Sequence, residues 1–410
     1  MQQNLHATNH YLHYPDEKNI PPYLAYGFRP IFLVLAPYLV LSMVLWGLVW
    51  SGIINIPFME DVLTWHIYEM IYGIISAGTL AFLATGLPEL FPGLVPLVGK
   101  RLKYIVILWL LGRVSFWFID LTGIYLSAIL NLAMLGWIIW FARHAVLDKL
   151  QRHASLGYAV LALFIVEVWF FASKLGFVDS NAMDILKVAT GLSVVLILLA
   201  LRRVNMEAIN ELMQDKEIDD LFISRAPKTN LAIFSVLIFT AVEFLYPNNS
   251  ALGWIALATG SAILGITSEY KLKEKFILNQ PYVIYLGSVY VMFSLGYALI
   301  GWDILNPNID AIHHFRHFIT AGGIGLSYLV VMLIITWIHT GRHLTSNIYT
   351  HTMVAMMIIA AFMRGLIPFY ESYSYQLYIC SSILWSLPFV IYIKIFYSFL
   401  LTPRADGIKG

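Results

Sequence analysis

Long apolar segments, separated by short polar breaks, follow one another from about residue 28 to residue 402. Roughly 20 apolar residues in a helix cross a bilayer core of about 30 Å, and the chain holds twelve segments of this kind. They lie near 29–53, 62–87, 102–119, 121–141, 156–174, 183–201, 229–246, 251–269, 281–302, 312–338, 348–368 and 375–401. Continuous apolar runs exclude the alternating strands of a membrane barrel. We therefore expect an all-α integral membrane protein with about twelve transmembrane helices.

The composition agrees with the lipid bilayer as the main surroundings of the chain. Hydrophobic residues make up 60% and charged residues 12%, and the mean hydropathy is +0.75, far from the composition of soluble domains. A net charge of +1 argues against a nucleic-acid partner. Because Cys380 is the single cysteine, the chain forms no internal disulfide, and any metal needs His, Met, Tyr, Asp or Glu ligands.

The distribution of Lys and Arg predicts the topology, since short cytoplasmic loops are enriched in both. The N-terminal tail, the even-numbered loops and the C-terminus hold nineteen of these residues, and the odd-numbered loops hold four: Lys174, Lys187, Arg316 and Arg364. We therefore expect both termini in the cytoplasm, with tails at 1–26 and 403–410. Residues 27–402 form one membrane domain of six plus six helices, divided by a charged cytoplasmic loop at 202–228.

Histidines gather at the expected outer ends of the second and tenth helices. WHIYEM (65–70) contains His66 and Glu69, and HHFRH (313–317) contains His313, His314 and His317. His66 and Glu69, and His317 with each of the other two, are three or four residues apart and can share a helix face. Neutral imidazole is a common ligand of iron, copper and zinc, although histidines at helix ends also serve as interfacial polar groups.

A second group lies near the opposite end of the tenth helix, in WIHTGRH (337–343), with His351 opening the next helix. The 22 residues from His317 to His339 span about 33 Å in a continuous helix, so one metal centre cannot use both. The glycine-rich TAGGIG (320–325) between them is typical of close helix packing, and it would also leave room for a flat cofactor.

Charged residues inside apolar segments are functional candidates, because burying them in lipid is costly. Arg113 needs an anionic partner, which Asp120, Glu167, an anionic substrate or a haem propionate would supply. Glu167 and Glu243 are candidates for proton transfer or for pairing with Arg113 or Lys187.

Several motifs resemble those of the NnrS family, bacterial polytopic membrane proteins linked to nitric oxide and nitrosative stress and containing haem and copper. The similar elements are GFRPIF (27–32), WHIYEM, the long segment RHFITAGGIGLSYLVVMLIITWIHTGR (316–342), LGRV (111–114) and PRADG (403–407). The resemblance spans nearly the whole chain. Tyr68 stands where the family has the second histidine of Trp-His-x-His-Glu-Met, which argues against copper, and Leu333 and Ile334 replace a Thr-Arg pair.

The resemblance implies a haem-binding protein of the bacterial inner membrane that acts on nitric oxide or another small diatomic ligand, with haem b as cofactor and a quinol or other redox partner. Whether it turns over a substrate stays open. His66 and His317 are the leading ligand candidates, and Glu69 and Tyr68 are candidates for proton donation or ligand orientation. The remaining expected metal ligands are His313, His314, His339 and His351, and the expected cofactor-binding residues are Arg29, Arg113 and Arg342.

Two other functions compete with this interpretation. The six plus six arrangement and the intramembrane residues Arg113, Glu167 and Glu243 are also compatible with a secondary transporter of a small anionic or metal substrate, whose site would lie near the membrane midplane. A sensor or assembly factor that holds a cofactor without turnover is the third possibility.

Overall fold

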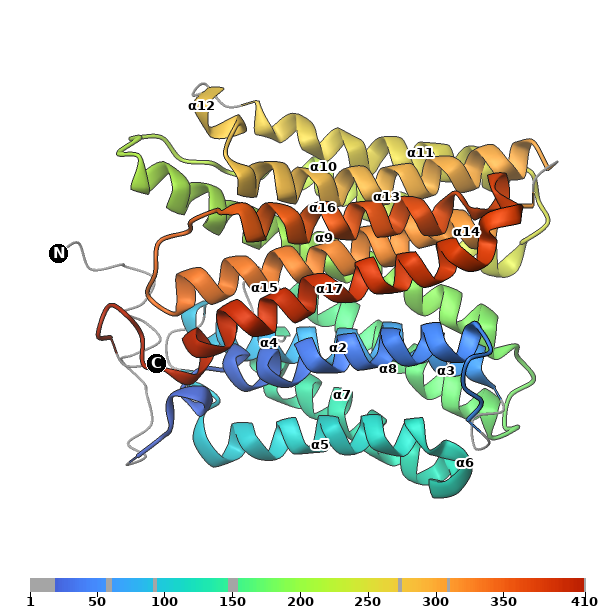
Figure 1. Cartoon of the computed structure of the whole chain (residues 1–410), viewed down its shortest axis with the longest axis horizontal. Helices are drawn as coiled ribbons and strands as arrows, with labels where there is room; N and C mark the ends of the chain where they lie inside the picture. Colours follow the sequence, from blue (N-terminus) through green and yellow to red (C-terminus); the bar gives the residue numbers. More distant parts are fainter. Residues whose placement is uncertain are drawn as a thin grey trace.

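The computed structural model describes residues 19–56, 61–90, 94–146, 154–271, 275–307 and 310–408, and these form helices and connecting turns without any strand. Twelve long helical segments run roughly side by side (Figure 1). The first six comprise α2 (Phe28–Trp50), α3 (Val62–Tyr68) continued by α4 (Ile74–Leu90), α5 (Gly99–Trp117), α7 (Ile124–Val146), α8 (Ala154–Lys174) and α9 (Ala182–Asp215). The second six comprise α10 (Ala226–Leu245), α11 (Ala251–Ile266), α13 (Pro281–Leu305), α14 (Ile312–His317) continued by α15 (Gly325–His339), α16 (Ile348–Gly365) and α17 (Ser374–Leu401).

The described helices confirm the expected all-α multi-pass membrane fold. Eleven of the twelve segments are long and apolar enough to cross a bilayer. The twelfth, α5, has 19 residues and runs beside the others, but it carries Lys100, Arg101, Lys103 and Arg113. The four charged residues of α5, rather than its length, distinguish it from the eleven segments that are apolar enough to cross a bilayer.

One boundary differs from the sequence-based expectation. The sixth helix was expected to end at residue 201, but α9 continues to Asp215. The charged residues after 201 therefore extend a helix beyond the apolar segment, because Arg, Glu and Met are good helix formers even where no lipid surrounds them. The connector to α10 is correspondingly short.

Two of the central helices contain π-helical turns. Residues Glu69–Gly73 (η2) join α3 to α4, and residues Phe318–Ile324 (η4) join α14 to α15. Each turn begins within three residues of a candidate histidine, His66 or His317, and π-helical turns frequently mark functional sites. The tenth helix is continuous through its π-helical turn, so the histidines at its two ends are far apart, as expected.

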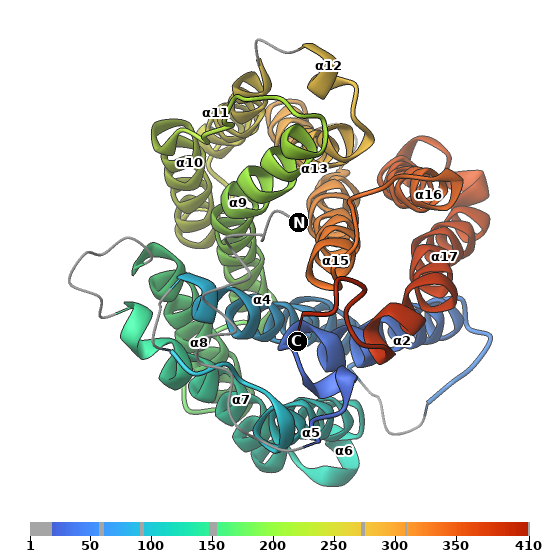
Figure 2. The same cartoon turned by 90° about the vertical axis from the view of Figure 1, so that its left-hand side faces the viewer.

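The described chain begins and ends at the same end of the bundle (Figure 1). At this end, the Tyr26 hydroxyl lies 3.3 Å from Nδ1 of His339, and the Ala405 amide donates to the Thr340 carbonyl at 3.0 Å. We call it the His339 end and the opposite one the His66 end. Viewed along the helices, α4, α9 and α15 lie toward the middle (Figure 2), in line with the large buried share of these segments.

Candidate functional site

His66 lies in α3 at the His66 end, and its ring stacks on an indole. The ring centroids of His66 and Trp46 are 3.8 Å apart, with an angle of 7° between their planes. Nδ1 of His66 is buried and has no hydrogen-bond partner in the described part of the chain. An unsatisfied buried nitrogen is costly, so this imidazole is suited to a partner beyond those that the described residues provide.

His317 has a fixed tautomer. Its Nδ1 lies 2.9 Å from the backbone oxygen of His313, and because a carbonyl oxygen only accepts, Nδ1 must carry the proton. Nε2 therefore presents its lone pair, the arrangement that orients a metal-binding histidine. His66 and His317 lie near enough for the charge of one to act on the other. The ring of His313 is exposed, so His313 contributes its carbonyl to this contact.

Arg364, at the end of α16, lies beside the histidines of the His66 end. One of its Nη1 hydrogens is donated to Nδ1 of His314 at 2.6 Å, and its guanidinium lies 4.6 Å from the centre of the Tyr378 ring. Its charge also acts on His66 and His317. No carboxylate pairs with Arg364 among the described residues, so it is a half-buried cation within a membrane-spanning helix that lacks an anion. The sequence interpretation had counted it as a loop residue.

The donor set limits which metal species this group fits. No set of three or more His, Cys, Asp or Glu side chains converges as a metal site within the described ranges. A metal held only by protein side chains needs such a set, whereas a porphyrin supplies four nitrogens of its own and asks for one or two axial ligands. Haem would find its axial and propionate contacts here in Nδ1 of His66, which is unpartnered among the described residues, in the oriented ring of His317 and in the cation of Arg364.

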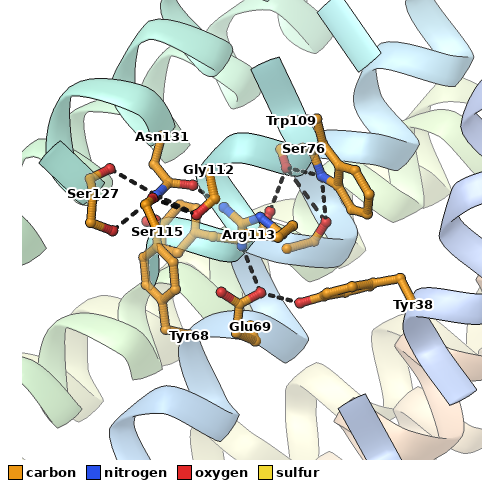
Figure 3. Close-up of polar contacts among 12 residues, drawn as sticks. Tyr38, Tyr68, Glu69, Ser76, Trp109, Gly112, Arg113, Ser115, Ser127 and Asn131 are labelled. Atoms are coloured by element: carbon orange, nitrogen blue, oxygen red, sulfur yellow. Dashed lines mark hydrogen bonds and ion pairs between the residues drawn. The ribbon is translucent and has the colours of Figure 1, made fainter. Parts of the chain in front are cut away.

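A buried ion pair lies one turn further into the bundle, where Glu69 opens the first π-helical turn (Figure 3). Nη1 of Arg113 lies 2.8 Å from Oε2 of Glu69, and both side chains are almost completely buried. The Tyr38 hydroxyl donates to the same carboxylate oxygen, and Nη2 of Arg113 donates to Oδ1 of Asn131. Arg113 therefore has an internal anion, different from the partners that the sequence had suggested.

Two glycines make room for this network. A Cβ on Gly73 would lie 2.7 Å from both Oε2 of Glu69 and the Tyr38 hydroxyl, and a Cβ on Gly112 would lie 2.9 Å from Oδ1 of Asn131. Separations below about 3 Å are not tolerated in packed interiors. At both positions a Cβ would therefore force the polar side chains of the network to shift.

Tyr68 and Glu167 form a second buried pair next to the first. The Tyr68 hydroxyl donates to Oε1 of Glu167 at 2.6 Å. The tyrosine ring stacks on both Phe116 and Phe170, with centroid distances of 3.9 and 4.9 Å, and the Arg113 guanidinium lies 5.7 Å from its centre. Tyr68 thus occupies the position of the missing family histidine as a hydrogen-bond donor to a carboxyl group.

The remaining charged candidate for transport, Glu243 on α10, pairs with Arg316. The guanidinium donates to both carboxylate oxygens, one of them at 3.3 Å. Of the three intramembrane residues that favoured a transporter, Arg113 and Glu243 are therefore held in ion pairs. Glu167 is left without a cation bound to it in the described residues.

The candidates at the His339 end have separate partners. His351 accepts or donates through Nδ1 at 2.7 Å from the Tyr285 hydroxyl, whereas His339 contacts Tyr26. Arg342 stacks on Phe399 at 4.0 Å and donates to the Thr340 carbonyl.

Arg29, another expected cofactor ligand, is fully buried. Its Nη1 is within 2.7 to 3.2 Å of three backbone oxygens at the end of α17: those of Phe399, Leu400 and Thr402. This arginine therefore caps the carbonyls of the last helix, where a cation is favourable.

The glycine-rich stretch of the tenth helix is closely packed. A Cβ on Gly323 would lie 2.3 Å from the Phe293 ring, and one on Gly325 would lie 2.7 Å from the Trp385 indole nitrogen. Neighbouring side chains already fill the space at these glycines. Of the two interpretations of TAGGIG, close helix packing is the one that the structure supports.

A cavity near the His339 end is lined mostly by apolar side chains of α2, α4, α9 and α15, together with His339 and the Arg203–Glu207 ion pair. The hydroxyl oxygens of Thr79 and Thr85, which also line it, are buried without a hydrogen-bond partner in the described part of the chain. This lining combines an apolar wall with a few polar groups.

These features define a polytopic helical membrane protein with a histidine-rich site at one end and buried ion pairs beneath it. The chain belongs to the NnrS protein family, whose family model matches residues 22–404, nearly its whole length. This membership supports a role for this membrane protein in the nitric oxide response. No curated protein and no solved structure is significantly similar to the chain.

Proposed function

We propose that the protein binds haem in the bacterial inner membrane and acts there in the response to nitric oxide, with His66 and His317 as the candidate iron ligands. One observation carries the proposal: the imidazoles of His66 and His317 are near enough for their charges to interact, in a family linked to nitric oxide. Nδ1 of His66 is buried without a hydrogen-bond partner among the described residues, and the Nδ1 proton of His317 is fixed on a backbone carbonyl.

Arg364 supports the same assignment. Haem carries two propionate carboxylates, and arginine is the residue best suited to bind a carboxylate through two donors. A cation in a membrane-spanning helix without an acidic partner among the described residues favours an anionic ligand of this kind. In this proposal His66 and His317 hold the iron, and Arg364 holds a propionate.

Bound haem would supply iron for a diatomic gas, which would have to replace one of the two histidines, and the surrounding pocket decides whether the gas is bound or transformed. The protein's own residues orient the ligands and exclude water. Trp46 covers one face of His66, and the His313 carbonyl holds His317. Glu69, which the sequence suggested as a partner for His66, instead bonds with Arg113 and Tyr38.

The test is an absorption spectrum of the purified, detergent-solubilised protein, oxidised and reduced with dithionite, with haem and metal quantified on the same sample. We expect a Soret band in the wild type and loss or shift of the band in His66→Ala and in His317→Ala. Arg364→Gln should lower the haem content.

His313→Ala is the matched control, because it removes an exposed ring and keeps the carbonyl that orients His317. Its spectrum should equal that of the wild type. A wild-type protein that stays colourless after reconstitution with haem, or spectra unchanged in both His66→Ala and His317→Ala, would overturn the assignment.

A further inference from the structure

Glu167 is a buried carboxyl group whose surroundings differ from those of every other intramembrane acid described above. Glu69 and Glu243 each form an ion pair with an arginine, whereas in the described part of the chain Glu167 accepts a hydrogen bond only from the neutral Tyr68 hydroxyl, at 2.6 Å. Its side chain lies in the middle of α8 and is 1% exposed. An ionised carboxylate in such a place would lack the charge compensation that burial demands.

The second oxygen of Glu167 has no partner. Oε2 is buried without a hydrogen-bond partner in the described ranges, and so is Oε1 of Glu69. Because the Tyr68 phenol donates to Oε1 of Glu167, a proton on this carboxyl group belongs on Oε2. The pair thus offers one defined proton position.

The charged and titratable groups that act on Glu167 come from neighbouring helices. Tyr68, Tyr72 and Glu69 lie on the segment from α3 to α4, and Arg113 lies on α5. The Arg113 charge is largely compensated by Glu69, 2.8 Å away. A gain or loss of the Glu167 proton therefore changes the net charge of the combined network.

A water-sized route approaches this pair from the His66 end. A cavity of about 330 Å³ is lined by residues of α3, α5, α6 (Ile119–Thr122), α7 and α8. At the surface it is lined by Asp120 and by the partly exposed Asp61–Lys174 ion pair. Its lining also includes Phe116 and Phe170, the two rings that stack on Tyr68. Phe116 and Phe170 therefore contact both the cavity and the ring of Tyr68.

We propose that Glu167 and Tyr68 form a proton-binding site inside the membrane, loaded from the aqueous phase at the His66 end through the cavity lined by Asp120, Phe116 and Phe170. The ligand is the proton of hydronium or water. Loading is a transfer of one proton to Oε2 of Glu167, with Tyr68 keeping its own proton and donating to Oε1. This site does not depend on the haem assignment, because none of its groups contacts His66 or His317 by a hydrogen bond among the described residues.

The test is infrared spectroscopy of the carboxylic acid C=O band in the solubilised full-length protein, without added haem. We expect a protonated carboxyl band at neutral pH that disappears in Glu167→Gln and persists in Glu243→Gln, a matched carboxyl group held by Arg316. Tyr68→Phe keeps the carboxyl group and removes the phenol donor, so the band should move to higher frequency. If Glu167→Gln fails to fold, this frequency shift still identifies the group.

Transfer into D₂O tests the route. The band should shift promptly in the wild type, and Ile124→Trp, which adds bulk to the cavity lining, should slow that shift. Absence of a Glu167 band would show an ionised group and overturn the proton site. An exchange rate unchanged by Ile124→Trp would overturn the route. Neither result depends on a Soret band, so failure here and failure of the haem proposal are distinguishable.

Discussion

Removing the cation of the buried ion pair should destabilise the protein strongly. In Arg113→Met the side chain keeps a similar length, but the fully buried Glu69 loses the donor at 2.8 Å and keeps the Tyr38 hydroxyl. A buried charge left without its partner costs about 3–5 kcal/mol. We expect a destabilisation of this size, because Glu69 has no access to solvent that could replace the guanidinium.

The measurement is the unfolding midpoint in a denaturing-detergent titration, followed by tryptophan fluorescence. Arg143→Met is the control: Arg143 lies on Trp140, donates to its carbonyl and has no acidic partner among the described residues. Its effect should be below about 1 kcal/mol. The double variant Glu69→Gln/Arg113→Met removes both charges and should recover most of the loss, giving a coupling energy that marks the pair. Equal midpoints for Arg113→Met and Arg143→Met, or losses that simply add in the double variant, would refute the role assigned to this pair.

Two further predictions concern packing and pH. Gly73→Ala places a methyl group 2.7 Å from Glu69 and Tyr38 and should lower stability by about 1–3 kcal/mol in the same titration. Gly86→Ala meets no atom within 4 Å and should leave stability unchanged. Equal effects of the two substitutions would contradict the close fit at Gly73. Partial burial raises the pKa of Asp61, but hydrogen bonds from Lys174 and Thr64 outweigh it and hold that pKa below its ordinary value. The contribution of Asp61 to stability is therefore present above its unfolded pKa of about 3.9 and lost as pH falls through the lower folded value. Asp61→Asn should flatten the acid side of a plot of the unfolding midpoint against pH. An unaltered curve would argue against the contact.

The sequence predicted the helices well because the length of an apolar run and the thickness of a bilayer are directly comparable. It predicted the pairing of charges poorly. In lipid a helix is apolar around most of its surface, so the pattern does not indicate which face meets which neighbour. Arg113 therefore had several candidate anions, and the one it contacts, Glu69, had been assigned to His66.

Arg364 was missed for a related reason. It lies in the last turn of α16, and counting charges for topology treats such residues as part of a loop. Its proximity to His314 and to Tyr378 depends on how three helices pack at one end of the bundle. The sequence did contain an indication of its role, since an arginine within an otherwise apolar segment of a membrane protein needs an anionic partner.

The contact between the first and last helices has a consequence for how the protein is made. Arg29 in α2 is satisfied by backbone oxygens 370 to 373 residues later in the chain. When a ribosome has delivered the first helix to the membrane, these three backbone oxygens have not yet been synthesised. The contact between α2 and α17 therefore forms only after α17 has been made, so the final packing of an early helix depends on a late one.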